Sequence, residues 1–162
     1  MQNAKDTFYI ALRNRLTQIN PARTMVLRSV ERPAIYVEDA ESPQPLSMLN
    51  AFALRWVGAS RQTELPRPLI ALNCQIVYAT AGTQPMAGLD RGRVLAAMDA
   101  ELERMLSPAQ TQKMSYSAAG SSPCQTMIFW SQPQFGPTVA LRDQLSRVAQ
   151  VTVWSWQEGN NL

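Results

Sequence analysis

The sequence contains no histidine and only two cysteines among its 162 residues. The absence of histidine removes the commonest general base and metal ligand, and it excludes catalytic pairs of histidine with serine or cysteine. Cys74 and Cys124 are far apart in the chain, and each lies in an apolar run. This placement favours two buried free thiols over a disulfide or a reactive thiol.

Charged residues are also scarce, at 17% of the chain, while hydrophobic residues make up an ordinary 46%. A chain with few charges has less polar material for its outside, so part of its apolar surface is predicted to face a partner. The net charge is +3, and thirteen of the fifteen basic residues are arginines scattered along the sequence. Because no run of about five basic residues occurs, we expect no nucleic-acid recognition and favour solvated or protein-interface arginines.

Long hydrophobic runs are missing as well. No stretch approaches the ~20 apolar residues of a membrane span, and residues 1–15 lack the apolar core of a secretion signal. We therefore expect no membrane contact and a reducing cytoplasmic setting. The length predicts a single domain, residues 1–162, and no repeat, low-complexity tract or linker divides it.

Two segments have the periodicity of amphipathic helices, and each is followed closely by a proline. In residues 6–20 apolar side chains recur at offsets of three and four, with Asp6 as the expected N-cap. Residues 90–106 carry a clearer apolar stripe, with Asp90 as the expected N-cap. A further short helix is one possibility for residues 140–148.

Period-two alternation predicts several strands. The clearest strand is 69–80, and a short proline-containing link makes residues 51–59 its expected hairpin neighbour. The predicted buried face of strand 69–80 consists of Ile70, Leu72, Cys74, Ile76 and Tyr78. Further strands are expected at 124–131 and 149–156, with short β-type runs at 24–30 and 34–38; loops are expected at 39–46, 81–88 and 107–123, the last with a possible short strand at 113–117.

The order helix, strands, helix, strands predicts an α+β fold. We expect a mostly antiparallel sheet, because strand 69–80 has one apolar face and one partly polar face. Two main helices are expected to pack together on the apolar face of this sheet.

Motifs that carry chemistry are weak in this sequence. The stretch GLDRGR is neither a phosphate-binding loop nor a dinucleotide fingerprint, and it is typical of a turn that leads into a helix. Glu38, Asp39 and Glu41 cluster in a loop without an identifiable second set of ligands, which favours a hydrated acidic loop over a metal site or an acid/base pair. We predict no catalytic, cofactor-binding or metal-ligating residues, and no enzyme activity.

Two arginines at the start of the second helix oppose the helix dipole. Arg91 and Arg93 either destabilise the start of this helix slightly or pair with a carboxylate of another chain.

The tryptophans of the last predicted strand offer a more specific clue. Trp154 and Trp156 point the same way and Val151 and Val153 point the other way, so both faces of this strand are apolar. One interpretation is a core with tryptophans on each face of the sheet. The other is an aromatic association patch on the outer face, where Trp and Arg are favoured. The candidate interface residues are Trp130, Trp154, Trp156, Arg91 and Arg93.

The layout resembles the tail-terminator and minor tail proteins of long-tailed bacteriophages and related prophages. The segments that carry this resemblance are DTFYIALRNRLTQI, AFALRWVGAS, LIALNCQIVYATAG, GLDRGRVLAAMDAELERML, QTMIFWS and VAQVTVWSW. The chain departs from the pattern in the wide gap between its first helix and residues 51–59, which leaves another tail or baseplate component as an alternative.

The resemblance implies a homo-oligomer, a closed six-fold ring (a hexamer) on the tail tube that presents a surface to the head connector, built from heterologous subunit contacts. It implies no catalytic residue and no cofactor, and a place in the virion tail, or in the host cytoplasm during assembly. Segments 38–45 and 107–122 are the contact candidates. The alternative is a small cytoplasmic α+β module that binds a ligand or a protein as a monomer or dimer.

Overall fold

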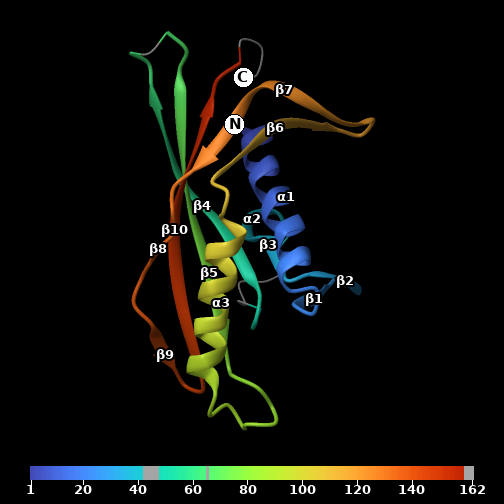
Figure 1. The fold of residues 1–162 in the computed structure, drawn as a ribbon, viewed down its shortest axis with the longest axis vertical. Coiled ribbons are helices and arrows are strands. Elements are labelled where there is room, and N and C mark those ends of the chain that lie inside the picture. Colours follow the sequence, from blue (N-terminus) through green and yellow to red (C-terminus); the bar gives the residue numbers. More distant parts are fainter. Residues whose placement is uncertain (42–47, 65, 159–162) are drawn as a thin grey trace.

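Helices are separated by groups of strands along the chain in a computed structural model that describes residues 1–41, 48–64 and 66–158. The helices are α1 (Gln2–Ile19), α2 (Glu38–Glu41) and α3 (Arg91–Met105). The strands are β1 (Thr24–Leu27), β2 (Val30–Pro33), β3 (Ile35–Val37), β4 (Phe52–Gln62), β5 (Leu69–Thr80), β6 (Gln110–Ser117), β7 (Gly120–Trp130), β8 (Gln134–Phe135), β9 (Val139–Leu141) and β10 (Gln144–Trp156). The prediction of an α+β fold is confirmed (Figure 1).

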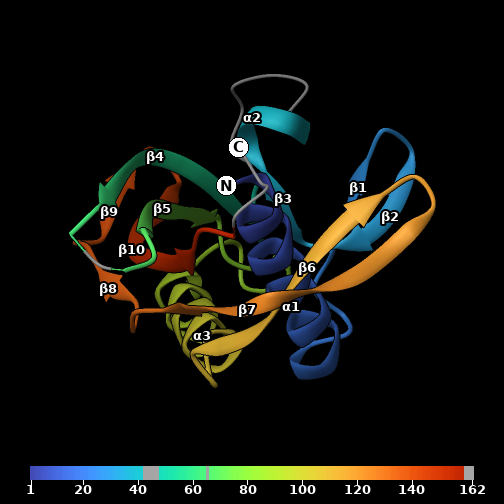
Figure 2. The ribbon, with the colours of Figure 1, turned by 90° about the horizontal axis from the view of Figure 1, so that it is seen from above.

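Eight of the strands form one curled sheet in the order β3-β4-β5-β10-β7-β6, and β8 and β9 also pair with β10. Figure 2 shows this sheet curling around α1. β3 runs parallel to β4, whereas the other pairs are antiparallel, so the sheet is mixed. The predicted layout, a mostly antiparallel sheet under two helices, is therefore met only in part, and α2 adds a short third helix.

The centre of the sheet is the long β5–β10 pair, whose register runs from Leu69↔Trp156 to Thr80↔Leu145. β4 and β5 are antiparallel neighbours, as predicted. Four residues of the predicted face of β5 are buried and the fifth, Ile70, packs against them. They share one core cluster with Phe8, Leu12 and Leu16 of α1 and Leu95, Met98 and Leu102 of α3. We call this the inner face of the sheet and the opposite one the outer face.

A second, smaller cluster lies on the outer face near β3. Tyr36 and Ala53 belong to it, and their strand neighbours Ile35, Phe52 and Leu54 belong to the main core. Because alternate residues of a strand point to opposite faces, the two clusters lie on either side of the sheet. The β1–β2 hairpin packs on the sheet through the smaller cluster, to which it contributes Met25 and Leu27.

Of the two predicted N-caps, Asp90 is confirmed in position and Asp6 is wrong. α1 begins at Gln2, so Asp6 lies inside the helix, where its carboxylate accepts a hydrogen bond from Gln2 Nε2 at 2.8 Å. Asp90 does occupy the N-cap of α3, but its side chain makes no capping bond. Its carboxylate accepts hydrogen bonds from Thr83 N at 2.9 Å and Thr83 Oγ1 at 2.7 Å, which close the preceding loop.

The predicted short helix at 140–148 is wrong. β9 and β10 are joined there by a two-residue turn at Arg142 and Asp143, with Leu141 paired to Gln144 and Arg142 at a φ of 56°. β7, β8 and β9 follow one another antiparallel to β10, and prolines separate them because proline cannot donate to a ladder. Pairing of the start of β10 with the end of β5 outweighs the weak helical pattern.

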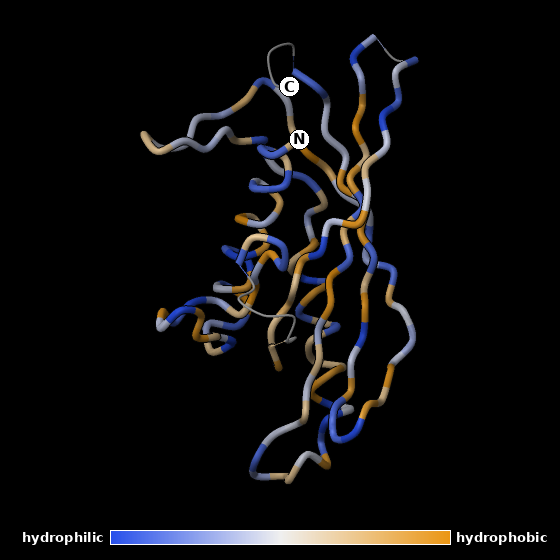
Figure 3. Tube along the Cα trace, turned by 180° about the vertical axis from the view of Figure 1, so that it is seen from behind, coloured by the Kyte–Doolittle hydropathy of each residue, from blue (hydrophilic) through white to orange (hydrophobic). Residues whose placement is uncertain are grey.

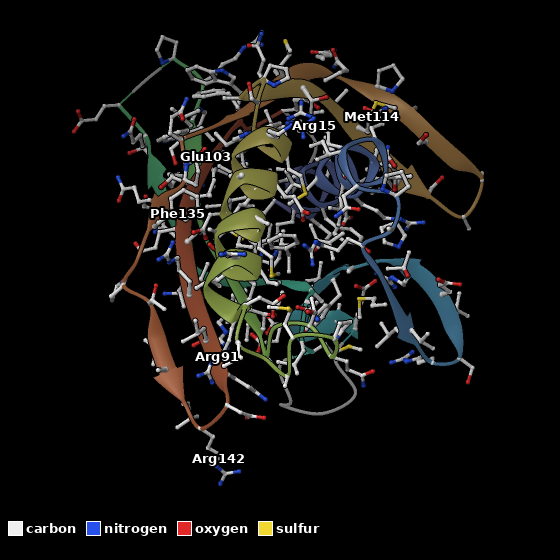
Figure 4. The ribbon with its side chains drawn as sticks, turned by 60° about the horizontal axis from the view of Figure 1, so that its bottom comes forward. Arg15, Arg91, Glu103, Met114, Phe135 and Arg142 are labelled. Carbon is white, nitrogen blue, oxygen red and sulfur yellow. The ribbon has the colours of Figure 1, made fainter. Side chains whose placement is uncertain are left out.

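The expected loop at 107–123 is also wrong, because most of it forms the long β6–β7 hairpin, although the possible short strand at 113–117 is confirmed as part of β6. This hairpin projects from the body beside α1 (Figure 1). Met114 N of β6, labelled in Figure 4, donates to Thr7 Oγ1 of α1 at 2.9 Å and ties the two elements together. The predicted run 24–30 is part of a hairpin of β1 and β2, in which Arg28 and Ser29 adopt left-handed conformations that suit a two-residue turn.

Residues 39–46 are described only in part. Residues 39–41 belong to α2, and the rest of the expected acidic loop lies outside the described residues. Glu38 pairs with Arg55 and Glu41 pairs with Arg32, so two of the three clustered carboxylates are used in ion pairs within the chain.

Candidate functional site

The outer face of β10 carries the two tryptophans singled out from the sequence. Val151 and Val153 are buried in the main core, and Trp154 and Trp156 stand half-buried on the opposite face. Trp154 stacks on Phe129 of β7 with ring centroids 5.4 Å apart and planes at 17°. The aromatic side chains of two neighbouring strands thus form one continuous surface.

Beside this stack the outer face is hollowed into a groove of about 580 Å³, which we call the outer groove. Its lining residues are Pro66, Arg67, Thr126, Met127, Phe129 and Trp156. The aromatic, methionine and arginine side chains among them belong to the residue types enriched at protein interfaces. The outer groove is therefore suited to an apolar partner surface.

Trp130 does not belong to this surface, contrary to its selection as an interface residue. It pairs with Val153, faces inward and is 3% exposed. Its ring packs edge to face on Phe8, and its Nε1 donates to Leu106 O at 2.9 Å. Trp130 is a core residue.

Arg91 and Arg93 lie far from the tryptophans, at the start of α3. Arg91 lines a shallow pocket together with Leu89 and Asp143, and Figure 4 places Arg91 and Arg142 toward the same end of the molecule. Arg93 is exposed. The five candidate residues therefore do not form one site: two are on the outer face, one is in the core and two lie at the opposite end.

Near these arginines the chain displays apolar side chains that sequence reasoning missed. Leu89 is 86% exposed, and Val139 and Leu141 of β9 are also exposed. The loop before α3 is closed by the Asp90–Thr83 hydrogen bonds, and a Cβ at Gly88 would lie 2.8 Å from Ala81 O. We call Leu89, Val139 and Leu141 the lower surface. The glycines around Leu89 were the available signal, since they mark a tight loop.

The inner face contains a different feature, a half-enclosed pocket of about 340 Å³ that we call the inner pocket. It lies between the start of α1 and the β4–β5 hairpin. Its lining residues are Met1, Asn3, Ala4, Ala59, Ser60, Arg61, Ile70, Lys113, Ser155, Gln157 and Glu158. A mostly apolar pocket with a few convergent polar groups is the usual form of a small-ligand site.

Lys113 is the most unusual side chain of the inner pocket, since it is a lysine only 5% exposed. Its Nζ donates to Trp156 O at 2.8 Å and Ser155 Oγ at 3.4 Å, and it lies 3.4 Å from Glu158 Oε1. Buried charges in proteins are normally paired in this way. Lys113 therefore fastens the end of β10 to the β6–β7 hairpin.

Glu158 completes this arrangement. Burial acts to raise its pKa, but hydrogen bonds from Thr126 and the charge of Lys113 outweigh burial, and the pKa is lowered. Thr126 donates from its backbone N at 2.7 Å and its Oγ1 at 2.6 Å. Glu158 is thus held as a carboxylate whose Oε1 contacts both Thr126 and Lys113. Sequence reasoning missed Lys113 and Glu158, because each lies in a polar stretch without a distinctive pattern.

The two thiols are both free, in agreement with the prediction, but only Cys74 is buried. Burial raises the pKa of Cys74 to about 12, and the pKa of half-buried Cys124 is also raised, chiefly by burial and by the charge of Glu158.

We expect an alkylating reagent at pH 8 to modify Cys124 before Cys74. Raising a thiol pKa from its ordinary value of 9.0 to about 12 lowers the thiolate fraction by about a thousandfold at that pH. Mass spectrometry of the Cys124→Ser variant, folded and in urea, measures this protection directly. Equal labelling of Cys74 in both conditions would contradict it.

Within residues 1–41, 48–64 and 66–158, no group of three or more cysteine, aspartate or glutamate side chains is placed to hold a metal ion. No helix in this part of the chain is long and apolar enough to cross a membrane. In comparisons with known proteins, neither a family model nor a curated protein sequence matches the chain.

Proposed function

We propose that the chain is a structural subunit that assembles with copies of itself, as a tail terminator or minor tail protein of a long-tailed phage, a prophage or a phage-like device. The placement of its exposed apolar side chains carries this proposal. The large exposed ones are spread over hairpins, loops and strands of the chain, and Figure 3 shows the hydropathy of these backbone segments. They include Val26, Val30, Val57, Met86, Leu89, Met127, Val139 and Leu141. Exposed apolar side chains favour contact with other proteins.

The positions of the outer groove and the lower surface favour a ring. Leu141 pairs with Gln144 at one end of β10, and Trp156 lies at the other end of this strand. At about 3.3 Å per residue these two ends are roughly 40 Å apart. Contacts between two different surfaces of one chain are heterologous, and they close into a ring when the rotation between subunits allows it. We propose a six-fold ring, as in the family that the sequence resembles.

In this proposal the faces of the ring bind the tail tube on one side and head-connector proteins on the other. The chain has a structural role without catalysis, and it resides in the virion tail, or in the host cytoplasm during assembly. Tail-tube and tape-measure genes beside the gene of this protein would support the assignment. A genomic neighbourhood of unrelated metabolic genes would count against it.

The assembly proposal predicts that Trp156→Ser dissociates the ring without unfolding the subunit. Truncation of a central interface tryptophan commonly costs about 2 kcal/mol or more, which is roughly thirtyfold in affinity. Light scattering coupled to gel filtration gives the oligomer mass, and thermal unfolding reports the fold of the subunit. Gln150→Ala, an exposed change on the same face of β10, is the control and should leave the mass unchanged. A wild-type protein that stays monomeric at the highest attainable concentration contradicts self-assembly.

A second candidate function is a small cytoplasmic module that binds a ligand. The inner pocket favours it, because the pocket combines apolar walls with the charged side chains of Arg61, Lys113 and Glu158. A monomeric wild-type protein that binds a small molecule in this pocket would support this candidate over the ring.

A further inference from the structure

The inner pocket has an apolar part and a polar part that suggest the chemistry of its ligand. Ala4 of α1, Ala59 of β4 and Ile70 of β5 supply apolar wall, and Ile70 also packs on the main core. Its volume of about 340 Å³ lies at the small end of the range for ligand sites. A short apolar chain fits this part of the pocket.

The charges around the pocket are not balanced for a neutral ligand. Lys113 and Arg61 are cationic, whereas Glu158 is the single carboxylate among the lining residues that the structure describes. The Lys113 ammonium has three donors, and Trp156 O, Ser155 Oγ and Glu158 already surround it. Lys113 therefore contributes positive potential rather than a free donor.

The Arg61 guanidinium has N–H donors that are not used in its hydrogen bond to Gln157. Its Nη2 donates to Gln157 Oε1 at 2.5 Å, and it makes no ion pair with any residue that the structure describes. A guanidinium has five N–H donors in a planar fork that matches a carboxylate. Within the described residues the ion pair of Glu158 is with Lys113 rather than with this fork, and its Oε1 also accepts hydrogen bonds from Thr126.

We propose that the inner pocket binds a carboxylate carried on a short apolar chain, with the carboxylate on Arg61 and the chain against Ala4, Ala59 and Ile70. Two sources share this chemistry: a free short-chain carboxylic acid, and the C-terminal carboxylate of a peptide that ends in an apolar residue. This inference deepens the ligand-binding candidate and is independent of the ring, because the outer groove lies on the other face of the sheet.

The test is calorimetric titration of the full chain with hexanoate and with hexanamide at constant ionic strength. We expect saturable binding of hexanoate and about tenfold or weaker binding of hexanamide, since the amide loses the charge-assisted hydrogen bonds. N-Acetylleucine and its amide form the second arm. Tighter binding of N-acetylleucine than of hexanoate would identify a peptide C-terminus as the ligand, and the reverse order would identify a free acid.

Two variants separate the polar and apolar parts of the site. Arg61→Gln should weaken hexanoate by about tenfold and leave hexanamide nearly unchanged, because only the charged partner is lost. Ala59→Leu should weaken both ligands, because the new side chain fills the apolar part of the pocket. Arg67→Gln is the matched control: it removes an arginine from the same hairpin that lines the outer groove instead.

Three results would overturn the proposal. They are equal affinity for hexanoate and hexanamide, the same loss in Arg67→Gln as in Arg61→Gln, and no saturable binding of any of the four compounds. The mass of the oligomer in the Trp156→Ser experiment is unaffected by these outcomes, so failure of this site and failure of the ring are distinguishable.

Discussion

Replacing Trp130 with alanine is expected to lower the free energy of unfolding by about 3–5 kcal/mol. Trp130 contacts three residues: its ring centroid lies 5.2 Å from that of Phe8, the Arg15 guanidinium lies 5.1 Å from its ring, and its Nε1 donates to Leu106 O. Alanine leaves a large cavity between β7 and α1, and it leaves the Leu106 carbonyl without this donor. Both effects destabilise the native state.

Urea unfolding followed by circular dichroism measures this change. Trp154→Ala is the matched control, because Trp154 is half-buried on the outer face and stacks mainly on Phe129. We expect the control to cost about 1 kcal/mol, in line with its partial burial and one aromatic pair. A loss in Trp130→Ala no larger than that of the control would show that Trp130 is not a core residue in solution.

Glu101→Gln is expected to lower the free energy of unfolding by about 3 kcal/mol. The Glu101 carboxylate pairs with Arg23, and the two side chains are 12% and 11% exposed. Arg23 Nη2 donates to Glu101 Oε1 at 3.0 Å and Asn20 Nδ2 donates to the same atom at 2.7 Å. The amide removes the negative charge and leaves the Arg23 guanidinium buried without a counter-ion, which is the costly part of breaking such a pair.

Glu103→Gln on the same helix provides the comparison. Glu103 is exposed, and its neutralisation should change stability by no more than about 0.5 kcal/mol. Replacing both partners, as in Arg23→Met with Glu101→Met, should cost less than Glu101→Gln alone, because no uncompensated charge remains. Equal losses in Glu101→Gln and Glu103→Gln would mean that the ion pair contributes little to stability.

The sequence predicted correctly the elements that depend on interactions between residues close in the chain, and it failed where distant segments must meet. The helix ending before Pro21 and the β4–β5 hairpin were predictable, because their periodicity and link residues are local. Residues 110–130 lack hydrophobic alternation over most of their length, yet they pair as β6 and β7. Only contact with α1 and the end of β10 makes a hairpin of that polar segment favourable.

The candidate surface was predictable to the same extent. Alternation along the last strand places Trp154 and Trp156 on one face and the valines on the other, as found. The same rule cannot tell which way Trp130 points, because that depends on its pairing with Val153. The partners of Lys113 lie more than forty residues away along the chain, so its burial has no local signal at all.

The sequence by itself determined the α+β class, the buried face of β5 and the apolar character of both sides of β10, because these follow from the spacing of side chains along one element. The tertiary structure alone decided the register that buries Trp130, the curl of the sheet around α1, and the two hollows on opposite faces. These depend on which distant segments meet, and that choice is made by the summed burial and pairing of the whole chain rather than by any local pattern.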